Sequence, residues 1–274
     1  SALVGGAWQA GYRRVFFIQL ALSAVLLSGC QANIKPADPT EEEIRYDFQD
    51  LTYDPAGSSY EYHLYLPPYN TVEWLKIGVA EGACLEFCPV GTEKPVVLYG
   101  TSIAQGACAS RPGNAWPNIV ERELRLPLVN LGFSGSGKLE PEVFELLSEI
   151  DARIYIIDCM PNMTGLPGKI FDRIIAGVKI LRKHHDCPIL LVEHSGYVNE
   201  LTNGKRGESY KVTNRELWRA YIELLSSGET DIYYLTHDQI GLGMDGMVEG
   251  SHPNDLGMRH QADAVENKLK EILK

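Results

Sequence analysis

From residue 95 onward, short apolar runs alternate with amphipathic segments. The apolar runs predict buried strands of a parallel sheet over residues 96–100, 127–131, 153–159, 188–193 and 231–235. The amphipathic segments predict helices over residues 116–124, 141–150, 169–185, 214–226 and 257–273. In the second of these, Val143, Leu146, Leu147 and Ile150 form the predicted apolar face. This alternation predicts a three-layer α/β/α fold with a five-stranded parallel sheet, similar to the flavodoxin arrangement.

The residues before this α/β domain have a different texture. Residues 30–43 are polar, with prolines and a run of glutamates, and are typical of a tether. Residues 44–94 contain β-like patterns, and we expect strands over 60–66 and 74–79. The sequence therefore predicts a small β-rich domain over 44–94, followed by the α/β domain over 95–274.

The amino-terminal segment has the features of an export signal. Arg13 and Arg14 precede an apolar run over residues 15–27, which is too short for a comfortable transmembrane helix. Leu27-Ser28-Gly29-Cys30 follows, and it resembles a bacterial lipobox, in which the cysteine is lipidated. We therefore predict a signal peptide over residues 1–29 and a lipid anchor on Cys30. An ordinary signal peptide with an incidental cysteine is the alternative.

Composition narrows the partners and cofactors. The chain has 274 residues, 45% of them hydrophobic, and a formal net charge of -11. Because no basic patch stands out in the sequence, we do not expect a nucleic-acid partner. Cys84 and Cys88 lack the second pair of ligands that a zinc site needs, and there is no phosphate-loop or dinucleotide-binding motif. We expect no metal and no cofactor. Five cysteines besides Cys30 leave at least one unpaired.

Residue types that occur together in acyl-transfer sites follow three of the predicted strands and precede the last predicted helix. Ser102 follows the first strand, a glycine-rich loop over residues 130–137 follows the second, and Asn162 follows the third. Glu249 and His252 lie just before the last helix. Taken singly, each has an ordinary structural explanation, such as a helix cap for Ser102 or a turn for Asn162. Because parallel strands place their carboxyl ends at one sheet edge, we expect them to lie together.

These segments resemble the sequence blocks of the SGNH hydrolases, also called GDSL-type esterases. Gly100-Thr-Ser-Ile103 is similar to the Gly-Asp-Ser-Leu block, with threonine in place of aspartate. Asn130 to Gly135 is similar to the second block, and Asn162 is the residue of the third block that this chain keeps. His252-Pro253 with Glu249 is similar to the Asp-x-x-His-Pro block, with glutamate in place of aspartate. The residues in these blocks resemble those of an exported subgroup of the family, in which a small β-domain often precedes the hydrolase domain.

The resemblance implies a catalytic triad. Ser102 is the expected nucleophile, and His252 is the base that activates it and the acid that protonates the leaving alcohol. Glu249 is expected to orient the imidazole. Glutamate is one methylene longer than aspartate, so Asp245 or a backbone carbonyl is an alternative third member.

The resemblance also implies an oxyanion hole. Its expected donors are the backbone N–H groups of Ser102 and Gly135 and the side-chain amide of Asn162. Three further residues near the expected crevice are candidates for substrate binding: Arg111, Trp116 and His194. A surface arginine, a core tryptophan and a structural histidine are the alternatives for these three.

The expected activity is that of a serine esterase without cofactor, which cleaves short acyl esters through an acyl-enzyme. O-acetyl groups on carbohydrate are the expected substrate, on an enzyme tethered to the bacterial cell envelope. A lipid ester, a thioester, or acyl transfer to a sugar are alternatives. A different class, a non-catalytic glycan-binding lipoprotein on a degenerate hydrolase fold, is motivated by Thr101, Met163 and Glu249, where the motifs are altered.

Overall fold

The computed structural model describes residues 20–22, 62–78, 87, 91–200 and 202–274. One compact unit consists of Pro67–Thr71 and Gly91–Lys274, and the remaining described residues belong to a second unit. Most of the predicted export signal, the tether with Cys30, and the Cys84 and Cys88 pair lie outside the described residues. Within the described ranges, no helix is long and apolar enough to cross a membrane.

The described part of the second unit contains a two-stranded antiparallel sheet. Strand β1 (Leu20–Leu22) pairs with β2 (Tyr62–Leu64), which lies within the predicted strand over 60–66. Residues 74–78 form no strand, so the prediction of a strand there was wrong. Trp74 and Leu75 are neighbours in sequence and both are exposed, so the segment lacks the single buried face on which the alternation argument depends.

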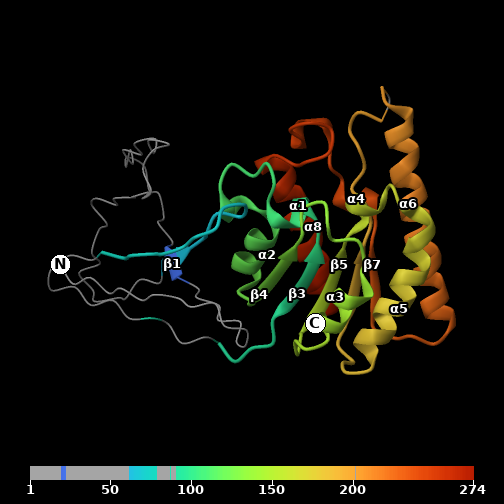
Figure 1. The fold of residues 1–274 in the computed structure, drawn as a ribbon, viewed down its shortest axis with the longest axis horizontal. Coiled ribbons are helices and arrows are strands. Elements are labelled where there is room, and N and C mark those ends of the chain that lie inside the picture. The colour runs from blue at the N-terminus through green and yellow to red at the C-terminus, as the bar shows by residue number, and fades with distance from the viewer. Residues whose placement is uncertain (1–19, 23–61, 79–86, 88–90, 201) are drawn as a thin grey trace. The chain divides into compact units, whose positions relative to one another are not determined.

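A five-stranded sheet forms the centre of the larger unit. Its strands are β3 (Val96–Gly100), β4 (Leu128–Gly132), β5 (Ile154–Asp158), β6 (Ile189–Val192) and β7 (Ile232–Leu235). Their spatial order is β4-β3-β5-β6-β7, and every neighbouring pair is parallel (Figure 1). All the residues of β3 and β5 are buried. The predicted five-stranded parallel sheet is confirmed.

Helices cover both faces of this sheet. They are α1 (Ser102–Gln105), α2 (Trp116–Leu124), α3 (Pro141–Leu147), α4 (Met160–Met163), α5 (Ile170–Arg182), α6 (Gly204–Ser226), α7 (His237–Ile240) and α8 (Asp255–Ile272). Buried residues of α3, α5 and α6 pack on one face, whereas those of α1, α2, α7 and α8 pack on the other. Figure 1 shows α5 and α6 on the opposite side of the strands from α2. The architecture is the predicted three-layer α/β/α fold.

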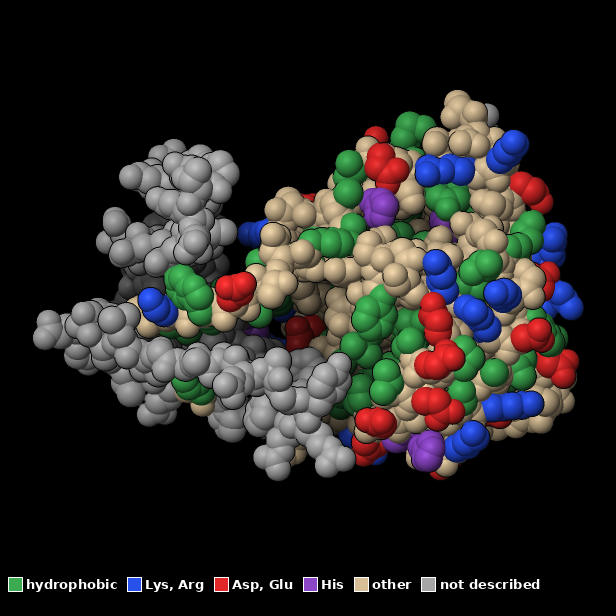
Figure 2. Space-filling model, in the orientation of Figure 1, with side chains coloured by type: hydrophobic (Ala, Val, Ile, Leu, Met, Phe, Trp, Pro, Cys, Tyr) green, Lys and Arg blue, Asp and Glu red, His purple; other side chains and the backbone are tan. Residues whose placement is uncertain are grey.

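Two details differ from the predicted pattern. In α3, Phe144 is fully buried while Leu146 is 63% exposed, so the buried face is rotated from the predicted one. Helix α6 begins at Gly204 rather than at residue 214, because its first turns are held by polar contacts with Asn203 and Glu200 rather than by an apolar stripe. On the face shown in Figure 2, the acidic and basic side chains of the described residues are intermixed rather than segregated.

Candidate active site

Ser102 lies in a tight turn between β3 and α1. Thr101 adopts an extended backbone and its hydroxyl accepts a hydrogen bond from the N–H of Ile103 at 3.3 Å, which caps the short helix. The helix ends at Gly106, whose φ of 100° is in the left-handed region. Thr101 is fully buried, so the residue that replaces the aspartate of the motif serves as a helix cap. Ser102 itself is partly exposed at the sheet edge.

The loop that follows β4 packs directly on this turn. The N–H of Phe133 donates to the carbonyl oxygen of Gly100 at 3.1 Å. A Cβ at Gly137 would lie 2.2 Å from the same carbonyl oxygen, so only glycine allows this approach. The side-chain amide of Asn130 donates to the carbonyl of Ala104 at 2.8 Å. Motif residues at the end of β4 and in the loop after it therefore hold the loop against the segment that carries Ser102.

His252 is brought to Ser102 by a closed loop just before α8. The Val248 N–H donates to the His252 carbonyl at 2.9 Å, and the Asn254 N–H donates to the Gly246 carbonyl at 2.9 Å. The Asn254 side chain then caps α8. With the loop closed in this way, His252 Nε2 lies 2.9 Å from Ser102 Oγ, although the two residues are far apart in sequence. The predicted pair of nucleophile and base is in hydrogen-bond contact.

Glu249 completes a chain of three side chains. Its Oε1 accepts from the backbone N–H of His252 at 2.9 Å and lies 2.5 Å from His252 Nδ1. The intervening turn contains Gly250, whose φ is 67°. Asp245, the alternative third member, is exposed, and within the described chain its carboxylate makes no contact with His252. The geometry therefore pairs His252 with Glu249.

This contact determines the arrangement of protons on the imidazole. A carboxylate oxygen at Nδ1 can only accept, so Nδ1 carries the proton and Nε2 presents its lone pair to the Ser102 hydroxyl. The side chains of Glu249 and His252 are 49% and 31% exposed, which leaves the pair open to solvent and to a ligand. Partial burial raises the pKa of the nearby Cys108 thiol, and the negative charge of Glu249 raises it further. The thiol therefore stays protonated at neutral pH.

The three donors that the sequence motifs predict for an oxyanion hole are open in the structure. The backbone N–H groups of Ser102 and Gly135 make no hydrogen bond within the described part of the chain. The Asn162 amide nitrogen donates one hydrogen to the Phe133 carbonyl at 3.3 Å, and its second hydrogen is not used by any described residue. All three residues are at least partly exposed, so these donors are accessible to a developing oxyanion.

The candidate substrate-binding residues have different surroundings. Trp116 is fully buried and packs in the core between α2 and the sheet, so the prediction that it lines a pocket was wrong. The sequence placed it just after the nucleophile turn, but it is the first residue of α2 and faces inward. Arg111 is exposed and its Nε donates to the Asn114 side chain at 3.0 Å. A role for Arg111 in substrate binding stays a prediction.

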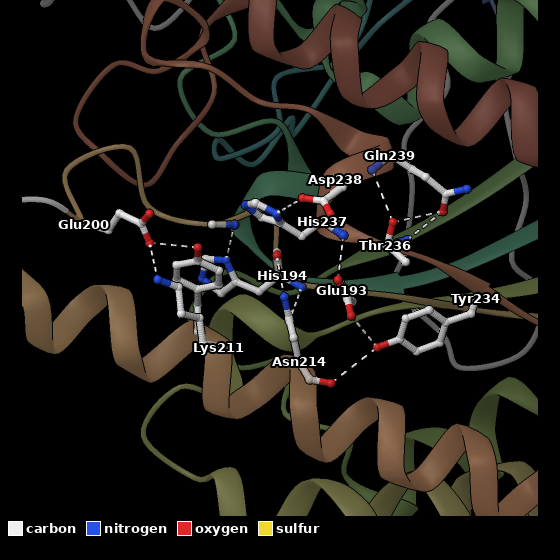
Figure 3. A network of polar contacts seen from close by, with 12 residues as sticks. Glu193, His194, Glu200, Lys211, Asn214, Tyr234, Thr236, His237, Asp238 and Gln239 are labelled. Atoms are coloured by element: carbon white, nitrogen blue, oxygen red, sulfur yellow. Dashed lines mark hydrogen bonds and ion pairs between the residues drawn. The ribbon is translucent and has the colours of Figure 1, made fainter.

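His194 is also buried, at 1% exposure, and is held by the structure around it (Figure 3). The Asn214 side chain accepts from the His194 N–H at 2.8 Å and donates to its carbonyl at 3.1 Å. The Gly196 N–H donates to His194 Nδ1 at 2.9 Å, so the ring proton is on Nε2. Burial, together with the positive charges of His237 and Arg206, lowers the pKa of His194 to about 3. The expected contact with substrate is therefore corrected to a structural, neutral histidine.

Gln105 belongs to none of the motif positions with a predicted role. Its side-chain oxygen accepts from the Ser134 N–H at 3.1 Å, and its side-chain nitrogen donates to the Pro68 carbonyl at 2.6 Å. No periodicity or motif distinguishes this glutamine, since its partners are backbone groups of distant segments. In the described ranges, no group of three or more His, Cys, Asp or Glu residues is placed to hold a metal ion.

The α/β/α sheet and the Ser102–His252–Glu249 chain together have the architecture of the SGNH-type hydrolases. The sequence model of the GDSL-like Lipase/Acylhydrolase family matches residues 93–270, and that of the N-terminus of SGNH-hydrolase-type esterases matches residues 33–85. The chain belongs to the GDSL-like lipase/acylhydrolase family, a class of ester-bond hydrolases. No curated protein matches the chain significantly.

Solved structures agree with this assignment. A protein described as a GDSL-like lipase, from Bacteroides ovatus, is 37% identical with a TM-score of 0.72, over 76% of this chain. The matched part spans 62% of that protein's length. A family two carbohydrate esterase from Clostridium thermocellum, in complex with cellohexaose, is 15% identical with a TM-score of 0.55, over 69% of this chain and 67% of that one. A carbohydrate acetylesterase family member from Sinorhizobium meliloti is 15% identical with a TM-score of 0.51, over 66% and 99%. At these low identities, the last two show the fold alone.

Proposed function

We propose that this protein is a serine esterase that hydrolyses short acyl esters, with O-acetyl groups on carbohydrate as its substrate. The observation that carries the proposal is the continuous chain from Ser102 Oγ through the His252 ring to Glu249, with contacts of 2.9 and 2.5 Å. A binding protein has no need of a serine paired with an oriented imidazole. Open N–H donors beside the serine supply the second requirement of acyl transfer.

In the first half of the reaction, Ser102 Oγ attacks the ester carbonyl carbon while its proton moves to His252 Nε2. The carbonyl oxygen becomes an oxyanion, which accepts hydrogen bonds from the Ser102 and Gly135 N–H groups and from Asn162. Glu249 stabilises the imidazolium that forms. The bond to the alkoxy oxygen then breaks, and His252 returns the proton to the leaving alcohol, which leaves an acyl-Ser102 ester.

In the second half, water takes the place of the alcohol. His252 Nε2 accepts a proton from this water, the oxygen attacks the acyl carbon, and the bond to Ser102 Oγ breaks as His252 reprotonates the serine. The products are the carboxylic acid, the alcohol and the original enzyme. One oxyanion donor is typically worth about 3 kcal/mol, or on the order of 10²–10³ in rate, so the open donors contribute substantially.

The choice of substrate rests on two supports. Two of the fold neighbours are carbohydrate esterases, one of them a carbohydrate acetylesterase family member. The second support is the open setting of the Ser102–His252 pair, since both residues are partly exposed at the sheet edge. A small acyl group on a large, hydrophilic alcohol suits a nucleophile that lies at the surface.

The test is release of acetate from p-nitrophenyl acetate and from acetylated xylan, with Ser102→Ala beside the unmodified protein. Ser226→Ala is the control, because Ser226 is an exposed helix serine whose hydroxyl bonds only to the carbonyls of its own helix. We expect hydrolysis and labelling by a fluorophosphonate probe to be lost in Ser102→Ala and kept in the control. Equal background in all three proteins would refute the esterase and favour the glycan-binding alternative. Selective activity on lipid esters or thioesters would correct the substrate.

We also propose that the protein is exported and lipid-anchored at Cys30 in a bacterial envelope. The support is the sequence alone: Arg13 and Arg14, the apolar run over residues 15–27, and Leu27-Ser28-Gly29 before the cysteine. Expression in a bacterium with radiolabelled palmitate should label the unmodified protein and not Cys30→Ser. Labelling that persists in Cys30→Ser would refute the anchor.

A further inference from the structure

Of three consecutive backbone N–H groups in the loop after β4, the first two have different partners and the third is open. The N–H of Phe133 donates to the Gly100 carbonyl at 3.1 Å. The N–H of Ser134 donates to the Gln105 side chain at 3.1 Å. The N–H of Gly135 makes no hydrogen bond within the described chain. Because Gly135 is exposed, its N–H is an open donor that a ligand can reach, next to one that Gln105 occupies.

Packing holds the ends of this loop, and hydrogen bonds hold its middle. Close backbone packing holds both ends, because a Cβ at Gly132 would lie 2.5 Å from the Gln105 nitrogen and one at Gly137 would lie 2.2 Å from the Gly100 oxygen. Residues 133–136 between them are exposed. The turn closes on itself through the Ser136 N–H, which donates to the Phe133 carbonyl at 3.1 Å. Two side chains from outside the loop hold the peptide between Phe133 and Ser134. Gln105 accepts from its N–H, and Asn162 donates to its carbonyl at 3.3 Å.

The orientation of the Gln105 amide is itself determined by its partners. Its nitrogen donates to the Pro68 carbonyl at 2.6 Å, in the segment Pro67–Thr71 of the same compact unit. A carbonyl needs a donor and the Ser134 N–H needs an acceptor, so the amide can satisfy both in only one of its two flipped orientations. Gln105 is also the last residue of α1, the helix that begins with Ser102. Its backbone is therefore tied to the nucleophile and its side chain to the loop.

We propose that Gln105 is a positioning residue for the oxyanion hole: it holds the Ser134 peptide so that the Gly135 N–H stays where the oxyanion forms. This inference rests on the proposed esterase function. Gln105 touches neither the serine hydroxyl nor the substrate carbonyl, and acts through the loop. Its loss should weaken binding of the transition state while leaving binding of the neutral ester nearly unchanged.

The test replaces Gln105 with methionine, which has a similar length and neither hydrogen-bonding group. We expect Gln105→Met to lower kcat on p-nitrophenyl acetate about 10- to 100-fold, less than or comparable to the loss of one donor, with KM changed less than about twofold. A boronic acid forms a tetrahedral anion on the serine, and its inhibition constant should weaken by the same factor as kcat. Gln239→Met is the control, since Gln239 caps α7 and has no contact with the loop.

A second variant removes the same hydrogen bond from the other side. Ser134 and Gly135 are the central residues of the turn, and Gly135 has a φ of 68°, as in a type II turn, which favours proline at the first central position. Ser134→Pro thus removes the N–H that donates to Gln105, in a backbone conformation that suits proline. We expect the same loss in kcat and in boronate affinity as for Gln105→Met. If Gln105→Met does not fold, as judged by its unfolding midpoint, this variant decides.

The outcomes separate the two proposals. Ser102-dependent hydrolysis in the unmodified protein, with kcat and boronate inhibition within about twofold in the folded variants, would overturn the role of Gln105 and leave the esterase standing. An unmodified protein without Ser102-dependent hydrolysis would overturn both. If the two variants lose kcat/KM only because KM rises, with kcat unchanged, Gln105 acts in substrate binding, and this result would also overturn the proposal.

Discussion

Replacing His194 with asparagine should change how stability depends on pH. His194 lies after β6, its ring is 4.5 Å from that of Tyr197 and 5.5 Å from that of Tyr210, and its Nδ1 accepts from the Gly196 N–H. The asparagine side-chain oxygen occupies nearly the same place as Nδ1, so the variant keeps an acceptor for Gly196. It loses the ring contacts and the titratable group.

The size of the effect follows from the pKa. Burial, with His237 and Arg206, lowers the pKa of His194 from 6.5 to about 3, so between these values the unfolded chain binds a proton that the folded chain does not. The contribution of His194 to stability is therefore fully present above the unfolded pKa and is lost as the pH falls toward the folded pKa. Between about pH 7.5 and about pH 4.5, this loss is about 2–3 kcal/mol, at about 1.4 kcal/mol for each pKa unit.

The measurement is the free energy of unfolding by urea at both pH values. At neutral pH we expect His194→Asn to be less stable by about 1–3 kcal/mol, because a buried ring has been removed. This difference should shrink by about 2–3 kcal/mol at the lower pH, since the variant has no imidazole to protonate. Other titrating groups are present in both proteins and cancel in the difference.

His260→Asn is the matched control, because it removes an exposed histidine from α8. It reports what the loss of a surface imidazole does to the same measurement. A difference between His194→Asn and the unmodified protein that stays constant from one pH to the other would refute the argument that His194 is held neutral by burial.

Two further predictions concern groups behind the nucleophile turn. Complete burial raises the pKa of Asp158, whose carboxylate accepts from the Gln261 side chain at 3.2 Å, so the folded chain keeps a proton that the unfolded chain releases above a pH of about 4. Asp158→Asn should therefore gain stability relative to the unmodified protein as the pH rises from about 4 to about 8. The measurement is the free energy of unfolding by urea, and a difference between the two proteins that is the same at both pH values would contradict this. Gly137→Ala should lower stability by more than about 2 kcal/mol, because its Cβ would meet the Gly100 oxygen at 2.2 Å. Gly165→Ala, where a Cβ meets nothing within 4 Å, is its control, and equal melting temperatures in the two variants would count against the packing argument.

The strands and long helices of the larger unit were predictable because burial repeats at a regular period. The pattern placed β3 and α2 at their observed bounds, since a run of buried residues or an apolar stripe is visible in the sequence itself. The helices α1, α4 and α7 have four residues each, too few to show a period. Each is instead specified by its ends or by the strand before it.

Elements held by polar contacts rather than by an apolar stripe could not be predicted from hydrophobic periodicity. The first turns of α6 contain Gly204 and Gly207, and they lack an apolar stripe. The Asn203 side chain caps them at the Arg206 N–H, and the Glu200 carboxylate accepts from the Tyr210 hydroxyl at 2.8 Å. The burial of Trp116 and His194 could not be predicted from the sequence pattern either. Their residue types suit a pocket as well as a core, and only the packing of neighbouring elements decides between the two.

The substitution of glutamate for aspartate is the part of the site that the motif left open. Glu249 lies three residues before His252, and its Oε1 reaches both the backbone N–H and Nδ1 of that histidine, at 2.9 and 2.5 Å. The turn between the two residues passes through Gly250, whose φ of 67° is in the left-handed region. At Gly250, a Cβ would lie 3.0 Å from the Asn199 side chain, so a larger residue would strain both the turn and its packing. Glu249 therefore makes the contact with His252 Nδ1 that the motif expects from aspartate, whereas a sequence comparison that scores this position alone would count it as a departure.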